Sequence, residues 1–337
     1  MSMTRQSNRH LNDGKLRILM IGSKNPWRME AAVERAFRRA GHKTLLIDDR
    51  RTKRLIGRGL TQHWVRARAQ GFRPDFVFLS KCLALEPETV EGIIKDVPNA
   101  MWYHDPQWHA DLDRPDIAHI ATIGRLAHNF LVTGFDAEWR AHGLRARFLP
   151  AAADQGIRPV PPETRFKTDV TFIGTGYDRE RAKYLVEIAK HLDLKVWGLG
   201  WQRYSNRIPW GGRAVEGKEF AAVCSSSKIV LGINPERAWG GSGYTSDRTW
   251  MVMLAGGFLL GQYSPGLAAM LREGVHYAWY DDIAACINRC FHFVANTQER
   301  LAMRTQGSAF VRANHTYDQR IPYLLEDREW MNPLPPE

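Results

Sequence analysis

The segment from Ser246 to Leu267 carries residues whose types and spacing could bind an anion. A polar stretch, Ser246-Asp-Arg-Thr249, precedes an apolar run that is broken by Gly256-Gly257, and Ser264-Pro265-Gly266 then opens a second apolar segment. This order predicts a polar loop, a short helix, a break, a buried strand and a second helix. Backbone N–H groups and the helix dipole favour anions at a helix N-terminus, and Arg248 adds a positive charge. The segment therefore predicts an anion site at Arg248, with a surface ion pair to Asp247 or Glu236 as the alternative.

A second candidate lies at Gly174-Thr-Gly176, which follows an apolar run and precedes a helical pattern. The N–H groups of such a turn could hold a diphosphate, and Arg179 or Arg181 could add charge-assisted hydrogen bonds. A GxG sequence is also common in plain tight turns, so both interpretations stay open.

His104-Asp105 follows the apolar run Ala100-Met-Trp-Tyr103. Histidine and aspartate can both serve as a general base when they reach a substrate hydroxyl and have a suitable pKa. The alternative is structural, with Asp105 capping the turn before Pro106 and His104 only hydrogen-bonded.

Alternating apolar strands and amphipathic helices fill the first half of the chain, and the pattern restarts after residue 165. Repeated βα units predict an α/β protein with parallel, doubly wound sheets. The expected strands of the first half are 16–21, 43–47, 74–79, 100–103, 117–123, 129–132 and 147–149, with helices at 30–40, 87–94 and 136–142. In the second half we expect strands at 169–173, 195–197, 228–233, 258–260 and 277–279, and helices at 179–191, 283–294 and 298–313.

A proline-rich stretch separates the two halves and sets the expected domain limits. We expect a disordered tail at 1–15, a Rossmann-like domain at 16–152, a linker at 153–165, a second Rossmann-like domain at 166–316, and a C-terminal segment at 317–337 that returns to the first domain. Two such sheets facing across a cleft would bind a ligand at their strand ends. The glycine-rich loop 234–244 could close over that ligand, with Trp239 or Tyr244 stacking on it, or could be a plain surface loop.

The composition is that of a globular protein with an excess of positive charge. The 337 residues are 44% hydrophobic and 25% charged, with a formal net charge of +11, which favours anionic partners. A basic cluster at Asp49–Arg54 and Arg58 is interpreted as a solvated loop or helix face, with contact with an anionic partner as the alternative. No apolar run is long enough to span a membrane, the N-terminus lacks a signal-peptide core, and the four scattered cysteines indicate a reduced, cytoplasmic protein.

Several blocks of the chain resemble one family. Four blocks are similar to motifs of the GT-B glycosyltransferases related to spore-maturation protein CgeB, within glycosyl transferases group 1. They are Asp169-Val-Thr-Phe-Ile-Gly174 with Arg181-Ala-Lys-Tyr-Leu185, Lys228-Ile-Val-Leu231, Ser246-Asp-Arg-Thr-Trp250 with Ala255-Gly-Gly-Phe-Leu259, and Asn314-His-Thr-Tyr-Asp-Gln-Arg320. Phe148-Leu-Pro-Ala-Ala-Ala-Asp154 resembles the seam between the two domains of that family. The resemblance runs from Phe148 to Arg320.

This resemblance implies transfer of a sugar from a nucleotide-diphosphate-sugar co-substrate to a hydroxyl of a glycan, protein or small molecule. The implied donor-binding residues are Gly174, Thr175, Gly176, Arg179, Arg181, Asn234, Tyr244, Ser246, Asp247, Arg248 and Thr249, with Asp105 or His104 as catalytic base. One departure concerns Met251, because the family has an acidic residue there that binds ribose hydroxyls. Methionine is only a weak hydrogen-bond acceptor. Gly232 likewise replaces the usual Asn.

We expect no bound cofactor and no metal requirement. The adjacent acidic pairs, Asp48-Asp49 and Asp281-Asp282, point to different sides of an extended chain, whereas backbone amides, a helix dipole and arginine can neutralise a leaving diphosphate. Two rival functions remain open. The positive charge suggests a nucleic-acid acceptor such as a hydroxylated base in DNA, and Met251 suggests a non-catalytic nucleotide- or glycan-binding protein.

Overall fold

The computed structural model describes residues 14–106, 113–235, 238 and 243–333, in two compact units. Unit 1 contains the described residues up to Pro150 and the segment Tyr317–Met331, and unit 2 contains Ala151–Thr316 with the residues from Asn332. The tail expected at 1–15 lies outside the described residues except for Gly14 and Lys15.

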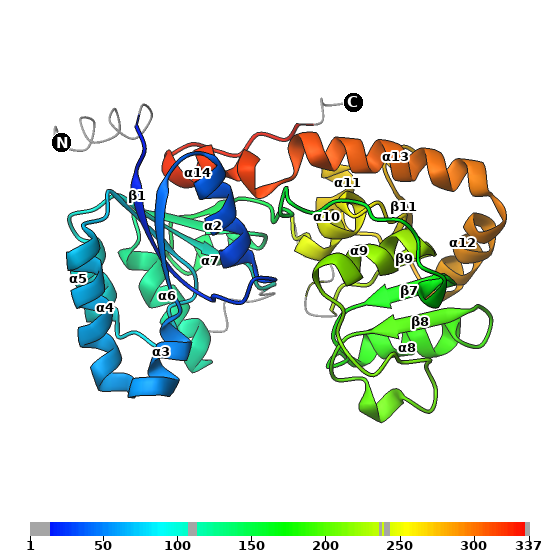
Figure 1. The fold of residues 1–337 in the computed structure, drawn as a ribbon, viewed down its shortest axis with the longest axis horizontal. Coiled ribbons are helices and arrows are strands. Elements are labelled where there is room, and N and C mark those ends of the chain that lie inside the picture. The colour runs from blue at the N-terminus through cyan, green and yellow to red at the C-terminus, as the bar shows by residue number, and fades with distance from the viewer. Residues whose placement is uncertain (1–13, 107–112, 236–237, 239–242, 334–337) are drawn as a thin grey trace. The chain divides into compact units, whose positions relative to one another are not determined.

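Unit 1 is built on a six-stranded, all-parallel sheet in the order β2-β1-β3-β4-β5-β6 (Figure 1). The two strands at its centre, β3 and β4, are buried at every residue, as expected for a parallel sheet that is covered on both faces. The strands are β1 (Arg17–Ile21), β2 (Lys43–Ile47), β3 (Phe76–Leu79), β4 (Asn99–Tyr103), β5 (Asn129–Val132) and β6 (Ala146–Phe148). The helices are α2 (Met29–Arg39), α3 (Asp49–Ile56), α4 (Arg58–Phe72), α5 (Pro87–Ile94), α6 (Pro115–Leu126) and α7 (Asp136–Ala141).

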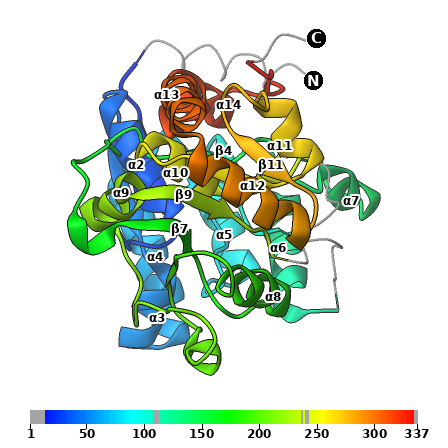
Figure 2. The same ribbon diagram turned by 90° about the vertical axis from the view of Figure 1, so that its right-hand side faces the viewer.

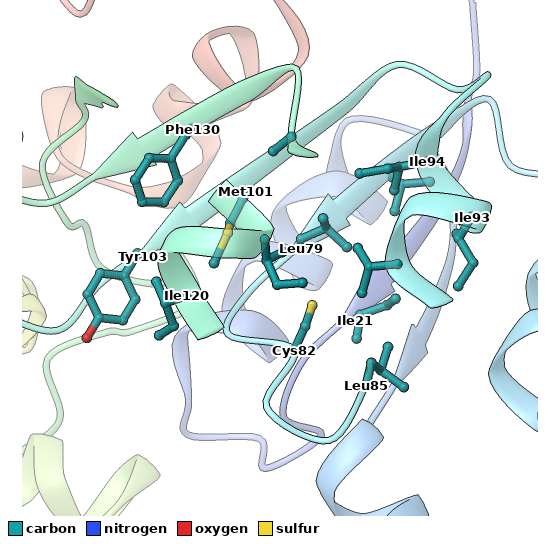
Figure 3. Close-up of a cluster of buried hydrophobic side chains, with 14 of the residues drawn as sticks. Ile21, Leu79, Cys82, Leu85, Ile93, Ile94, Met101, Tyr103, Ile120 and Phe130 are labelled. Atoms are coloured by element: carbon teal, nitrogen blue, oxygen red, sulfur yellow. The ribbon is translucent and has the colours of Figure 1, made fainter. Parts of the chain in front are cut away.

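A continuous apolar core packs the sheet of unit 1 against α4, α5 and α6. Leu79 and Met101 of the sheet belong to the same buried cluster as Ile93 of α5 and Ile120 of α6 (Figure 3). Cys82 belongs to the same cluster, and all four cysteines are free and buried. They are ordinary core thiols.

The C-terminal segment Tyr317–Met331 packs on unit 1 through η4 (Tyr317–Arg320) and α14 (Ile321–Leu325). Arg39 of α2 donates two hydrogen bonds to the Asp318 carboxylate, at 2.8 and 2.7 Å. Buried Arg320 donates from Nε to the Pro150 carbonyl at 3.0 Å. Residues far apart in the sequence thus complete one unit.

Unit 2 repeats the plan with a five-stranded, all-parallel sheet in the order β11-β10-β9-β7-β8. Helices α8 and α12 cover one face and α9 and α10 the other (Figure 2). The strands are β7 (Thr168–Ile173), β8 (Leu194–Trp197), β9 (Ser227–Gly232), β10 (Leu259–Gln262) and β11 (Ala278–Tyr280). The helices are η1 (Thr164–Phe166), α8 (Arg179–Ile188), η2 (Gln202–Tyr204), α9 (Gly217–Ser226), α10 (Asp247–Leu254), α11 (Pro265–Met270), α12 (Ile283–Ala295) and α13 (Thr297–Asn314).

The strand order of unit 2 reverses beside β7. The chain goes from β7 to β8 on one side and then crosses to β9 on the other, with Phe172 paired to Leu231. Such a reversal separates the loops that leave the two strands, and ligands of open α/β sheets bind at this point. The carboxyl ends of β7 and β9 therefore mark where a ligand site is expected in unit 2.

The predicted α/β class is confirmed, but one predicted element is wrong. Residues 117–123 were expected as a strand and form the middle of helix α6. Their buried members, Ile117, Ile120, Ala121 and Ile123, have the three- and four-residue spacing of a helix, and Pro115 occupies the first turn. The parallel strands β4 and β5 also need a helical crossover between them.

Helix α4, residues 58–72, was not among the expected helices. The basic cluster at Asp49–Arg54 lies on α3, and Arg58 of that cluster is the first residue of α4. Within the described ranges, no helix is long and apolar enough to cross a membrane.

Candidate functional site

The predicted anion site lies where the sheet of unit 2 reverses its order. Gly174 directly follows β7, Ile233 directly follows β9, and helices α8 and α10 begin beside them. The Asp178 side chain caps α8 by accepting from the Arg181 amide at 3.0 Å. Two helix N-termini and two strand ends thus supply the parts of this site.

Two arginines converge on one carbonyl at this position. Arg181 Nε donates to the Ile233 oxygen at 2.9 Å, and Arg248 Nη2 donates to the same oxygen at 3.1 Å. The Phe172 ring lies under both guanidinium groups, with its centroid 5.8 Å from Arg181 Cζ and 5.1 Å from Arg248 Cζ. Planar guanidinium groups that are fixed in this way suit phosphate oxygens, because each presents several donors in a rigid fork.

Arg248 is a partly buried cation that makes no ion pair with any carboxylate of the described chain. Its neighbour Asp247 instead accepts the Arg248 backbone amide, at 2.7 Å from Oδ1. Burial lowers the pKa of the guanidinium, and the negative charge of Asp247 opposes that shift. Arginine stays protonated at neutral pH even so. A bound anion would compensate a charge that the described side chains leave without a direct counterion.

The glycine turn is shaped by close packing around Arg248. A Cβ at Gly174 would overlap Arg248 Nη1 and come within 2.9 Å of Phe172 Cζ. The Gly174 amide donates to the Trp197 carbonyl and the Gly176 amide to the Leu199 carbonyl, each at 2.8 Å. Both glycine amides therefore already have acceptors inside unit 2. The exposed turn residue Thr175, by contrast, makes no backbone amide bond to the described chain.

The remaining predicted donor residues differ in how far they are buried and in which element carries them. Arg179 is exposed at the start of α8, and Asn234 follows Ile233 directly. Tyr244 is buried, and the Thr249 amide donates to the Ser246 carbonyl at 3.0 Å in the first turn of α10. Glu236, which was considered as an ion-pair partner of Arg248, and Trp239, which was considered as a stacking residue, lie outside the described residues.

Met251 lies on α10, three residues after Arg248, and is half-buried. Its position one turn into the helix places a thioether where the resembled family has a carboxylate. The Tyr280 hydroxyl donates to the Gly232 carbonyl at 3.2 Å nearby.

In unit 1 the two candidate bases, His104 and Asp105, have different surroundings. His104 packs on the Trp102 ring at 4.1 Å between centroids, and its Nδ1 lies 3.4 Å from the Trp102 carbonyl. Burial lowers the pKa of His104 to about 3, and its Nε2 is buried with no partner among the described residues. Asp105 is exposed and forms an ion pair with Lys81.

Two contributors to these sites were missed at the sequence level. Phe172 reads as an ordinary buried residue of an apolar strand, and only its position two residues before Gly174 hinted at contact with the turn. Lys81 comes two residues after β3, as Asp105 comes two residues after β4. Adjacent parallel strands end at the same edge of the sheet, so this shared offset could have predicted the pair. In the described part of the chain, no three His, Cys, Asp or Glu side chains are grouped to hold a metal ion.

The two parallel α/β units have the fold of GT-B glycosyltransferases. Residues 179–326 match the family described as glycosyl transferase-like. No curated protein matches the chain by sequence.

Solved structures that resemble the chain share this fold at low sequence identity. A sucrose-phosphate synthase from Thermosynechococcus elongatus superposes with a TM-score of 0.65 at 13% identity, covering 92% of this chain and 98% of that chain. HepE from Anabaena, in complex with UDP and glucose, gives 0.62 at 11% identity, covering 92% and 99%. The β-glucosyltransferase of phage T4 gives 0.60 at 12% identity, again covering 92% and 99%.

Proposed function

We propose that this protein transfers a sugar from a nucleotide-diphosphate donor to an acceptor hydroxyl, and that unit 2 binds the donor. The observation that carries the proposal is the pair Arg181 and Arg248, which meet at the Ile233 carbonyl over Phe172 where the sheet order reverses. The glycosyl transferase-like match over residues 179–326 begins at α8 and includes this pair. The blocks of the sequence that resemble the CgeB-related glycosyltransferases support the same donor class.

Breaking the bond between the sugar and the diphosphate places negative charge on the leaving phosphate. Groups that are already oriented toward that charge stabilise the transition state without reorganising. Arg248, the N-terminus of α10 and the Thr175 amide are the groups we assign to this task. We propose that they neutralise the diphosphate without a metal ion, although one structure of the phage enzyme was obtained with UDP and Mn²⁺.

We propose Asp105 of unit 1 as the base that accepts the proton of the acceptor hydroxyl. Its carboxylate is exposed at the end of β4, whereas the neighbouring His104 has its pKa lowered to about 3 by burial. A base works best when its pKa is near the working pH and when it can reach the substrate. His104 does not meet the demand of reach, because its Nε2 is enclosed, and this is the reason for preferring Asp105.

The donor site is tested by measuring the binding of UDP and UDP-glucose to the Arg248→Ala variant. Thermal shift and calorimetry give the affinities. Loss of the guanidinium removes charge-assisted hydrogen bonds, so we expect affinity to fall about 10- to 100-fold. Arg248→Lys, which keeps the charge but loses the fork, should fall in between. The control is Lys183→Ala, an exposed cation on α8 that pairs with Glu180, which should bind like wild type.

The same assays with a chelator present should give unchanged binding and turnover. A panel of uridine, guanosine, cytidine and thymidine diphosphate sugars covers the choice of base. If no member of the panel stabilises the wild type or is hydrolysed, the donor proposal fails and a non-catalytic role is favoured.

A nucleic-acid acceptor is the second candidate, because of the net charge of +11. A β-glucosyltransferase among the structural neighbours is described as a DNA modifying enzyme. Transfer of labelled sugar to duplex DNA with hydroxymethylated bases, decreasing steeply as salt rises, would support this acceptor. Transfer to carbohydrate acceptors only would exclude it.

A further inference from the structure

The α3–α4 corner, residues Lys53–Leu60, is an exposed turn at one end of unit 1, at the foot of α4 in Figure 1. All eight of its residues are exposed. Gly57 joins the helices with φ +79°, a conformation that side chains other than glycine rarely adopt, and nothing surrounds the position of its Cβ within 4 Å. In the described chain, no other side chain or backbone segment therefore packs on Gly57 at the turn.

Large apolar side chains gather at this corner. Leu55 is 73% exposed, Leu60 63%, Ile56 37% and, one turn further along α4, Trp64 41%. Leu60 and Trp64 are four residues apart and share one face of α4, whereas Thr61, Val65 and Ala69 on the other face are buried. Soluble domains rarely expose large apolar groups in such a cluster unless it contacts something.

The corner and the helical residues on either side of it are also strongly basic. Residues 50–68 include seven arginines and lysines and no acidic residue. Arg58 pairs with Glu86, and Arg68 lies over the Trp64 ring. In the described structure, the side chains of Arg50, Arg51, Lys53 and Arg54 pair with no carboxylate.

The two aspartates that precede this stretch offset only part of its charge, because two carboxylates stand against the seven arginines and lysines of residues 50–68. Asp48 Oδ1 accepts the Arg51 amide at 2.8 Å, and its Oδ2 accepts the Lys24 amide at 3.1 Å. Asp49 is buried and accepts the Ala84 amide at 2.9 Å. The surface charge of the corner is therefore positive.

We propose that the α3–α4 corner docks this protein on an anionic lipid bilayer. Leucine, isoleucine and tryptophan can insert at the boundary of headgroups and acyl chains while the surrounding arginines and lysines contact anionic headgroups. A nucleic acid would satisfy the same cations through its phosphates, but it would leave the aliphatic side chains of Leu55 and Leu60 in water. The combination of exposed aliphatic groups with cations favours lipid.

The test measures binding of the full chain to sedimented vesicles. Wild type should bind vesicles of phosphatidylcholine with about 40% phosphatidylglycerol and should not bind pure phosphatidylcholine, with affinity decreasing as salt rises. Leu55→Ser with Leu60→Ser should lower the affinity about tenfold or more, because two inserted side chains are lost. Arg51→Ser with Arg54→Ser should lower it by about 10- to 30-fold at low salt.

Matched controls remove the same groups elsewhere. Leu301→Ser takes an exposed leucine from α13, and Arg145→Ser with Lys218→Ser removes two exposed cations. Both should bind vesicles like wild type.

No vesicle binding by wild type, or equal binding by the corner variants and wild type, would overturn the proposal. Binding of duplex oligonucleotide that is lost with the arginines but kept without the leucines would overturn it in favour of nucleic acid. Donor binding should be unchanged in every corner variant, so this result is independent of the donor site.

Discussion

The imidazole of His104 is held inside unit 1 against the Trp102 ring, and this burial has a consequence for stability. Its folded pKa of about 3 lies below the ordinary value of 6.5. The unfolded chain therefore takes up a proton at a higher pH than the folded chain does. Protonation of His104 in the unfolded chain therefore lowers the free energy of unfolding as pH falls from about 6.5 toward 3. Above about pH 6.5 this loss of stability is absent.

His104→Asn should make stability less sensitive to acid. At pH 5 the wild type should have lost about 2 kcal/mol of unfolding free energy through this one residue, relative to pH 8. The variant lacks that component, so its stability should decrease less between the two pH values. Urea unfolding of both proteins at pH 8 and pH 5 measures the difference. Equal losses would show that His104 is not held in its neutral form.

Asp105 belongs to the same loop but has the opposite environment, exposed and paired with Lys81. If it is the base, Asp105→Asn should lower kcat about 10²- to 10⁴-fold and leave donor affinity unchanged, because only proton transfer is lost. The control is Asp96→Asn, an exposed acid after α5. Transfer at the wild-type rate by Asp105→Asn would remove the assignment.

At the scale of elements, the turn after β7 positions the arginine of another element. Because Gly174 has no side chain, the Arg248 guanidinium can occupy the space beside it. The ring of Phe172, on β7, packs against that guanidinium. The start of α10 and the end of β7 are thus fitted to each other, although more than seventy residues separate them in the sequence.

Gly174→Ala should therefore weaken donor binding by displacing Arg248. A Cβ there overlaps Nη1 of Arg248 and crowds the Phe172 ring, so we expect a cost of about 1–3 kcal/mol in stability together with reduced affinity for UDP. Gly71→Ala is the matched control, since no atom lies within 4 Å of its added Cβ and its helix should tolerate alanine. Chemical denaturation and calorimetry with UDP measure both effects. Wild-type UDP affinity in Gly174→Ala would contradict the fitted arrangement.

For the whole molecule, two parallel sheets of similar plan are each closed by helices on both faces, and unit 1 is completed by Tyr317–Met331. The net charge of +11 is not spread evenly, since seven of the basic residues lie within residues 50–68 of unit 1. A charge that looked like a general property of the chain is thus partly a local property of one corner.

Much of this could be predicted from the sequence. Continuous apolar runs such as Phe76–Leu79 identify buried parallel strands, because both faces of such a strand are covered. The motif blocks around Gly174 and Arg248 predicted residues that the structure brings together in unit 2. Residues 117–123 misled because isoleucines occur often in strands, and only their spacing, with Pro115 before them, distinguished a helix.

Tertiary structure alone decided the rest. Local patterns determine helices and strands because they depend on neighbours along the chain, but strand order brings together residues that no local pattern relates. The order β8-β7-β9 places Ile233 between Arg181 and Arg248, and parallel pairing places Lys81 beside Asp105. The protonation of His104 was likewise decided by burial. Burial depends on how the elements pack, and the sequence around His104 does not contain that information.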